Sequence, residues 1–195
     1  MLLNFNKGII LSAENYRMEI ENLLVQQFLP LGFKITRDVE VDTVAENSKY
    51  EALNFSLNDR RIVYRKGNVT PDRPGTFLSV WQRRVLEIDN GNKPIPLHSD
   101  ELDYLFIQVE DESERGLFIF PVEVLKEKGI VFSATKKGKT GFRVFPPWSQ
   151  DRGEVGTKVF SESGKKTQRW QLPFFIEIAE DGSIDAGELT KVFSA

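Results

Sequence analysis

Lysines, arginines and aromatic residues are interleaved between residues 133 and 170, and this combination suits a nucleic-acid ligand. Phosphates attract cations, and unpaired bases stack on flat aromatic rings. Gly138 and Gly141 would let the loop backbone approach a phosphate closely. The alternative is that the lysines are solvated loop residues and the aromatics are core. The candidate contacts in this segment are Lys136, Lys137, Lys139, Arg143, Trp148, Lys165, Lys166, Arg169 and Trp170.

Charge is distributed unevenly along the chain. The formal net charge of the 195 residues is -3, which by itself argues against a polyanionic partner. Residues 133–170 nevertheless hold nine Lys/Arg against three Asp/Glu, and residues 58–84 hold seven against two. These two segments therefore carry +11 and the remainder carries -14, so a basic and an acidic surface are both expected.

Glu51 is a second candidate for chemistry. In a strand that starts at Tyr50, Glu51 would share a face with Leu53 and point inward at the strand end. A carboxylate in that place is unfavourable unless it meets a cation. Arg65 or Lys66 on the next strand would supply one as a structural ion pair, and a degenerate magnesium site is the alternative.

Several kinds of catalytic site are excluded by composition. The chain has no cysteine and one histidine, His98, so thiolate zinc sites, cysteine nucleophiles and two-histidine metal sites cannot form within it. Lys136–Thr140 superficially suggests a phosphate loop, but the GxxxxGK[ST] spacing is missing. A nucleoside-triphosphatase is therefore rejected. Any catalytic site in this chain would have to use carboxylates, a lysine and a hard metal ion.

The elements that must position these residues can be predicted from periodicity. A helix is expected from Ser12, whose side chain would cap it, to Pro30 and Gly32, which would end it. Alternation with period two predicts a hairpin of residues 50–57 and 61–65. Further strands are expected at residues 76–83, 103–109, 117–120 and 142–145, with helices at 121–128 and 167–178. This order predicts a single α+β domain with a central mixed or antiparallel sheet flanked by helices.

Two strings are specific enough to suggest a family: FRVFPPW at 142–148 and KTQRWQL at 166–172. Together with residues 50–55, 65–71, 75–81 and 118–121, they resemble the MepB-like family of small bacterial proteins. The resemblance covers residues 50–178 as a core, with residues 1–49 as an N-terminal helix and arm and residues 179–195 as a C-terminal extension.

The resemblance implies a restriction-endonuclease-like core, similar to the PD-(D/E)XK phosphodiesterases, and a role in binding nucleic acid. In an active enzyme of that kind, an acid on one strand and a (D/E)xK motif on the next hold Mg²⁺ and activate water. Glu51 matches the first acid and Lys66 matches the lysine, but Tyr64 stands where the second acid should be. Asp103 or Glu46 would have to replace it.

We therefore expect a nucleic-acid-binding protein on a nuclease-like scaffold, with DNA as the ligand and no cofactor. Residues 58–84 and 133–170 would contact phosphates, Arg65 and Lys66 among them. One alternative is a Mg²⁺- or Mn²⁺-dependent nuclease with Glu51 and Lys66 as catalytic residues and with Glu51 and Asp103 as metal ligands. The other is a protein-interaction module that uses the acidic surface. No apolar run approaches the ~18 residues of a spanning helix, so a cytoplasmic protein without a membrane partner is expected.

Overall fold

A six-stranded mixed sheet forms the centre of the molecule, in the order β1-β2-β3-β8-β9-β13. The computed structural model describes residues 2–83 and 94–193, with side chains from residue 12 onward. Neighbouring strands are antiparallel except β3 and β8, which run parallel. The strands are β1 (Ile35–Val41), β2 (Leu53–Leu57), β3 (Arg60–Lys66), β8 (Tyr104–Asp111), β9 (Glu114–Pro121) and β13 (Phe175–Glu177).

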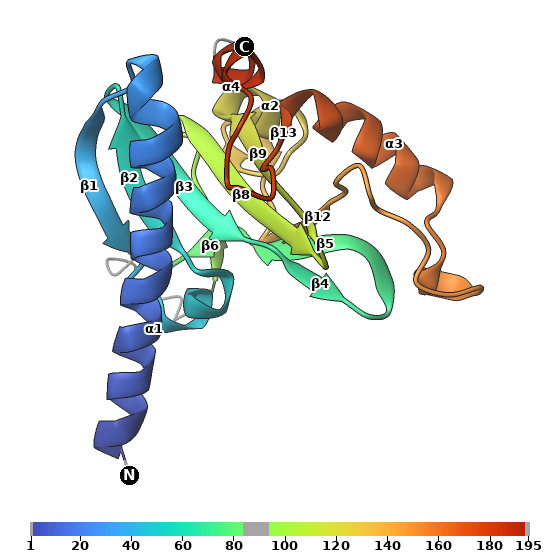
Figure 1. The fold of residues 1–195 in the computed structure, drawn as a ribbon. Coiled ribbons are helices and arrows are strands. Elements are labelled where there is room, and N and C mark those ends of the chain that lie inside the picture. Colours follow the sequence, from blue (N-terminus) through green and yellow to red (C-terminus); the bar gives the residue numbers. More distant parts are fainter. Residues whose placement is uncertain (1, 84–93, 194–195) are drawn as a thin grey trace.

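Two helices cover one face of this sheet. α1 (Leu2–Leu23) crosses β1, β2 and β3, and α4 (Ala186–Phe193) lies beside it over β9 and β13 (Figure 1). Tyr16, Ile20 and Leu189 are buried against Phe55 and Phe106 of the sheet. The C-terminal helix therefore shares one core with the N-terminal helix, and both pack directly on the central sheet.

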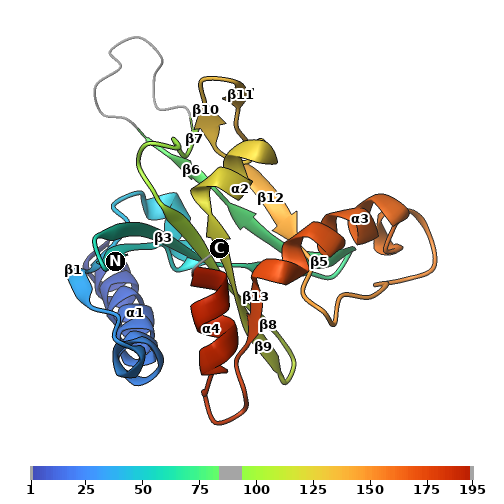
Figure 2. The ribbon, with the colours of Figure 1, turned by 90° about the horizontal axis from the view of Figure 1, so that it is seen from above.

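A smaller sheet and two helices cover the opposite face. This sheet has the order β12 (Gly141–Val144), β5 (Arg73–Ser79) and β4 (Asn68–Thr70). Its inner face, with Leu78 and Val144, packs on Ile107 and Phe118 of the central sheet. α2 (Val122–Glu127), β12 and α3 (Glu162–Gln171) lie side by side on this layer in Figure 2. The remaining two-residue strands pair as β6 (Trp81–Gln82) with β7 (Ile95–Pro96) and β10 (Phe132–Ser133) with β11 (Lys136–Lys137).

The predicted fold class is confirmed: an α+β arrangement with a central mixed sheet flanked by helices. The predicted covered strand is β8, which lies between β3 and β9 and whose apolar side chains are buried on both faces. The first helix ends where expected. It continues through η1 (Leu24–Phe28) and η2 (Leu29–Leu31) to Gly32, whose φ of 89° is the left-handed conformation that favours glycine.

Four local predictions are wrong. α1 begins at Leu2, so Ser12 lies within the helix and does not cap it. The hairpin strand begins at Leu53, because residues 45–50 form the 3-10 turn η3 (Ala45–Tyr50). The strand expected at 76–83 is divided into β5 and β6. The helix expected at 167–178 is α3, which ends before Pro173, followed by η5 (Leu172–Phe174) and β13.

No helix among residues 2–83 and 94–193 is long and apolar enough to span a bilayer. One further turn, η4 (Gly156–Lys158), lies in the long connection between β12 and α3. Arg84, part of the basic segment 58–84, lies outside the described residues.

Candidate nucleic-acid interface and the acidic cluster beside it

A lysine held between two glutamates lies where β3 and β8 end. The Nζ atom of Lys66 is 2.9 Å from an oxygen of Glu110 and 3.5 Å from an oxygen of Glu51. The parallel register places Lys66 opposite Gln108, so Glu110, two residues further, lies on the same face. Gln108 donates to Glu110 over 2.7 Å and accepts a hydrogen bond from the Tyr64 hydroxyl over 3.0 Å. We call Glu51, Lys66 and Glu110 the acidic cluster.

The two carboxylates of the acidic cluster are not equivalent. Burial raises the pKa of Glu51 even though the charge and hydrogen bond of Lys66 lower it, and repulsion from Glu19 and Glu110 adds to the rise. Burial alone would raise the pKa of Glu110 as well, but the hydrogen bonds from Lys66 and Gln108 hold it below its usual value. Burial would lower the pKa of Lys66, and the contacts with Glu110 and Glu51 reverse that direction. The pair Lys66–Glu110 is therefore the tighter one, and Glu51 is the carboxylate that is more easily protonated.

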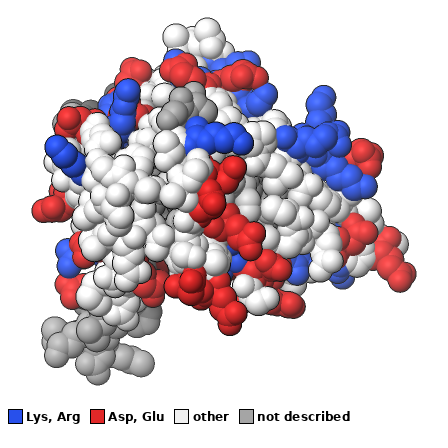
Figure 3. All heavy atoms as spheres, turned by 45° about the horizontal axis from the view of Figure 1, so that its top comes forward, with Lys and Arg blue, Asp and Glu red and all other residues white. Residues whose placement is uncertain are grey.

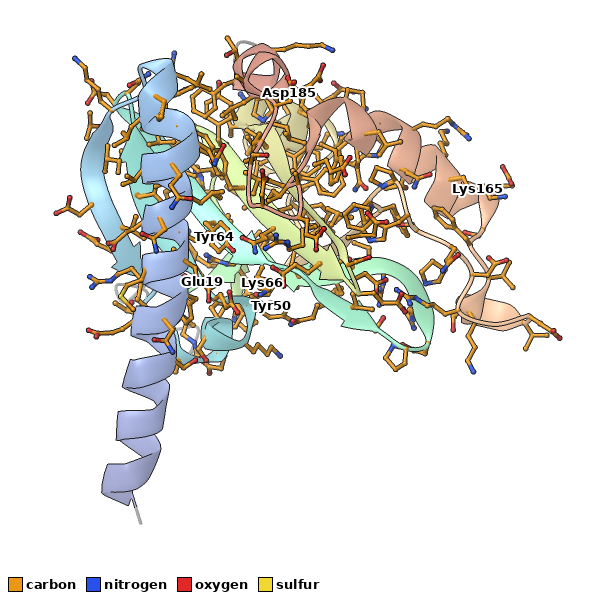
Figure 4. The ribbon with its side chains drawn as sticks, viewed as in Figure 1. Glu19, Tyr50, Tyr64, Lys66, Lys165 and Asp185 are labelled. Atoms are coloured by element: carbon orange, nitrogen blue, oxygen red, sulfur yellow. The ribbon has the colours of Figure 1, made fainter. Side chains whose placement is uncertain are left out.

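Glu51 reaches this place through an unusual backbone conformation. Its φ of 46° lies in the left-handed region, which costs a non-glycine residue of order 1–3 kcal/mol. The conformation ends η3, and the Glu51 amide donates to the Ser48 carbonyl over 2.9 Å. Tyr50, the preceding residue, packs edge-on against Phe77 of the small sheet at 6.4 Å. Figure 4 shows Glu19, Tyr50, Tyr64 and Lys66 close together at this side of the molecule.

The structure brings Glu51 and Lys66 together as predicted, but it does not bring Asp103 to them. Asp103 directly precedes β8, at the opposite end of the strand from Glu110. It accepts hydrogen bonds from the Arg61 backbone amide at 2.7 Å and from the Arg61 guanidinium at 3.1 Å. The hydrogen bonds from Arg61 lower the pKa of Asp103 despite its partial burial. The expectation of Asp103 as a second metal ligand is therefore wrong, and the other substitute, Glu46, pairs with Arg83 instead.

The acidic cluster does not fit a resident divalent cation. Its lysine ammonium lies between the two carboxylates, so a cation would have to displace it from both. Over residues 2–83 and 94–193, no group of three or more Asp, Glu or His side chains is arranged to hold a metal. Two carboxylates that share one lysine form an ion-pair network, which joins the ends of β3 and β8 to the residue that ends η3.

Arg65 was predicted to contact phosphate, and the structure contradicts this. Its side chain is 1% exposed and its Nη2 atom is 2.9 Å from the Asp42 carboxylate. A second nitrogen donates to the Tyr64 carbonyl over 2.8 Å. Asp42 also approaches Asn47, which in turn accepts a hydrogen bond from Ser79 over 3.0 Å. Arg65 is thus part of a buried polar network that ties β3 to η3 and the small sheet.

Arg143 is the best placed of the predicted cations. Residues Arg143 and Phe77 are paired across β12 and β5, so both side chains lie on the outer face of the small sheet. The guanidinium lies 5.7 Å from the Phe77 ring centroid and donates to the Thr70 hydroxyl over 2.8 Å. It also donates to the carbonyls of Pro74 and Gly75 over 3.3 Å. These contacts fix a half-buried guanidinium in one orientation.

Three hollows meet at Arg143. The first, of about 440 Å³, lies between the start of β5, η4 and the start of α3. The second, of about 310 Å³, lies between the end of α2, β12 and α3, and the third, of about 470 Å³, lies over the β4–β5 turn. We call the surface around them the Arg143 face, which comprises Arg73, Phe77, Lys128, Lys139, Arg143 and Trp170. Cations and rings alternate across this face, and the carboxylate of Asp72 also lines the third hollow.

The two tryptophans predicted to stack on bases have different positions. Trp148 packs edge-on against Phe175 at 5.5 Å and belongs to the core between the central sheet and the small sheet. Trp170 packs on Phe120 at 5.6 Å, but it also lines the second hollow, with the Lys128 ammonium 5.6 Å from its ring centroid. Trp170 therefore remains on the candidate interface and Trp148 does not.

The remaining predicted lysines and arginine are exposed, on and after β11 and on α3. Lys136 and Lys137 form β11, and Lys139 follows it and lines the second hollow. α3 presents Lys165, Lys166 and Arg169 to solvent, and Lys165 pairs with Glu162 at 2.9 Å. In Figure 3 basic side chains gather over α3, and a band of acidic side chains crosses the middle of the same view. The charge segregation expected from the sequence is thus also visible on this face.

Several residues of the two sites were missed by sequence reasoning. Glu110 lies one residue beyond the strand expected at 103–109, although the apolar run before it indicates a strand that could extend to it. Arg73 falls within the basic segment 58–84 that was expected to contact phosphates but was not singled out there, and Phe77 was expected only as a strand residue. Lys128 marks the end of the short helix, and only the packing of that helix against α3 brings it to the interface.

The chain is similar in sequence to one protein family and in structure to two solved proteins. The family model described as MepB-like matches residues 44–177. A crystal structure of MepB is 33% identical in sequence, with a TM-score of 0.61, over 72% of this chain and 85% of that one. A bacterial homing endonuclease is 14% identical with a TM-score of 0.38, over 83% of this chain and 90% of that one, and this likeness supports no conclusion. Among curated proteins, none matches this chain.

Proposed function

Because the chain belongs to the MepB-like family and carries a basic, aromatic face on an α+β scaffold, we propose that it binds nucleic acid, with DNA as the expected ligand. The observation that carries the proposal is Arg143. It is a half-buried guanidinium at the junction of three hollows, and no described carboxylate forms an ion pair with it. An arginine fixed in this way beside an aromatic ring suits recognition of a phosphate.

The other cations of the Arg143 face extend this site in two directions. Lys128 and Lys139 line the hollow next to Trp170, and Arg73 lines the hollows on the other side of Arg143. Lys165, Lys166 and Arg169 of α3 add exposed positive charge at the edge of the face. A backbone that follows these groups would release counterions, so its affinity depends on salt.

The proposal assigns no phosphate contact to Arg65 or Lys66. Arg65 is buried with Asp42, and Lys66 is neutralised by Glu51 and Glu110. The acidic cluster instead fixes the ends of the strands next to Tyr50, whose ring contacts Phe77 of the Arg143 face.

The test is binding of a fluorescent DNA duplex and of its separate strands, followed by anisotropy at several salt concentrations. We expect affinity to fall steeply between about 50 and 200 mM salt. The variant Lys128→Ala/Lys139→Ala should make the plot of log affinity against log salt concentration less steep, by the amount that corresponds to about two phosphate contacts. The matched control is Lys34→Ala/Lys191→Ala, which removes the same charge from residues outside the Arg143 face. Equal slopes for both double variants, or no binding at low salt, would contradict the proposal.

The same preparation decides between the alternatives that the sequence left open. The first alternative is a metal-dependent nuclease, and the lysine ammonium between Glu51 and Glu110 argues against it. Cleavage of labelled DNA in the presence of Mn²⁺ that is lost in Glu51→Gln would establish it. Equal residual cleavage by the parent and Glu51→Gln would indicate contamination. Recovery of a basic protein and no nucleic acid would favour a protein-interaction module.

A further inference from the structure

The first of the three hollows has the features of a site for one small ligand. We call it the Arg73–Arg143 pocket. It is lined by the start of β5, by Arg143 and Phe145, by the η4 turn and by the first turn of α3. Its volume of about 440 Å³ lies within the range of roughly 300–1,000 Å³ that small-ligand pockets occupy.

The floor of this pocket is a pair of stacked rings. Phe145 and Phe160 lie 5.1 Å apart with an angle of 22° between their planes, and both are almost fully buried. Two glycines make room for them. A Cβ atom on Gly75 would lie 2.5 Å from the Phe145 ring, and one on Gly164 would lie 2.8 Å from the Phe160 ring. Val159, which is 38% exposed, continues the apolar wall toward solvent.

The rim of the pocket carries two guanidinium groups with little compensating charge. Arg143 bonds only neutral oxygens among the described residues: the Thr70 hydroxyl and the carbonyls of Pro74 and Gly75. Arg73 is near an exposed carboxylate, that of Asp72, at 3.7 Å. Burial lowers the pKa of Arg143 and the charge of Arg73 lowers it further, while the charge of Asp72 opposes both effects without reversing them. Two like charges at one rim are stabilised by an anion bound between them.

We infer that the Arg73–Arg143 pocket receives one unpaired nucleotide, with its phosphate on the two arginines and its base against the apolar wall. The inference rests on the proposed function, because the nucleotide is taken to be part of a bound nucleic acid. A pocket of this volume admits a single base, and the flat, apolar floor suits a base more than a sugar or an amino acid. The protein should therefore prefer a duplex with an unpaired end, or a single strand, over a blunt duplex.

Two valines of the same loop provide the test. Val159→Trp places an indole in the pocket without a change of charge, and Val155→Trp is the control, because Val155 is 76% exposed and does not line the pocket. Anisotropy would be measured with a blunt duplex and with the same duplex carrying a short unpaired end. We expect the unpaired end to increase affinity roughly tenfold, the low part of the range for stacking of one base. Val159→Trp should abolish this preference, measured as the ratio of the two affinities of the same variant.

The outcomes separate this inference from the function on which it rests. Absence of any binding would overturn both. Equal affinity for the two duplexes, or an unchanged preference in Val159→Trp, would overturn the nucleotide pocket and leave the Arg143 face intact. Loss of the preference in Val155→Trp as well would assign the effect to the loop as a whole and would also refute the pocket. Arg73→Gln gives an independent check, since it should reduce the salt slope for the unpaired end by about one contact.

Discussion

Replacing Asp42 by asparagine is expected to lower the free energy of unfolding by about 3–5 kcal/mol, because it leaves the Arg65 guanidinium buried without a counterion. The Arg65 side chain is 1% exposed and that of Asp42 is 11% exposed, so water cannot replace the lost charge at Arg65. Burial lowers the pKa of Arg65, but an arginine remains protonated throughout the ordinary pH range. The substitution keeps the shape of the side chain and removes the charge.

Replacing the arginine of the pair should lower the free energy of unfolding by less. Arg65→Met removes the buried cation, and the partly exposed Asp42 still accepts a hydrogen bond from the Val44 amide over 2.8 Å. We expect a loss of about 1–3 kcal/mol, from the hydrogen bonds and the packing. The double variant should be more stable than the sum of the single losses predicts, by about 0.5–3 kcal/mol, because the two residues are in direct contact.

Urea unfolding followed by tryptophan fluorescence measures these differences. The matched control is Asp38→Asn, since Asp38 is exposed on β1, the strand that directly precedes Asp42, and its substitution should change stability by no more than about 0.5 kcal/mol. A loss below about 1 kcal/mol for Asp42→Asn, or strict additivity in the double variant, would refute the assignment of Arg65 to a buried ion pair. Arg65→Met should leave the DNA-binding salt slope unchanged, in contrast to the expectation from sequence.

Two further predictions concern the acidic cluster and the pocket floor. Glu110 has a lowered pKa, so its contribution to stability is present above the unfolded pKa and is lost as pH falls through the folded pKa. Glu110→Gln should therefore destabilise the protein near neutral pH by about 0.5–1 kcal/mol and lose this effect at a pH below the lowered pKa of Glu110. Glu51 has a raised pKa, so its ionised form disfavours folding as pH rises, and Glu51→Gln should stabilise the protein near neutral pH. Urea unfolding at both pH values measures the change in free energy of unfolding for each variant. A change of the same sign for Glu51→Gln and Glu110→Gln near neutral pH would contradict the electrostatics. Gly75→Ala should lower the free energy of unfolding by more than the ~1–2 kcal/mol expected for an alanine in the left-handed conformation, because its Cβ would lie 2.5 Å from Phe145. The control is Gly182→Ala, with φ of 84° and open space around it, which should lower the free energy of unfolding only by that amount in the same assay.

The parts of the fold that sequence predicts well depend on local pattern. Alternation with period two locates β2 and β3, and the apolar run of β8 identifies a covered strand, because both signals follow from which faces are buried. Proline and glycine mark the end of the first helix for stereochemical reasons. The meeting of Glu51 and Lys66 followed from their places on adjacent segments, although Glu51 is a turn residue and not a strand residue.

The features that sequence missed depend on contacts between distant segments. Among the basic residues of β3, only the position of Asp42 beside Arg65 decides which one is buried. Glu110 joins the acidic cluster because β8 pairs with β3 in one particular parallel register, which no local pattern encodes. The Arg143 face combines β5, β12, α2 and α3, so its outline depends on how the small sheet packs against both helices.

The central claim, that the Arg143 face binds DNA, is tested most directly by mapping the contact on the protein. Isotope-labelled protein would be titrated with a short DNA duplex at low salt, and the changes in backbone amide chemical shifts would be followed by residue. The largest changes are predicted at Gly141, Arg143 and the first turns of α3, with little change in α1 and α4, which cover the other face of the central sheet. Changes confined to α1 and α4, or a complete absence of changes, would contradict the claim.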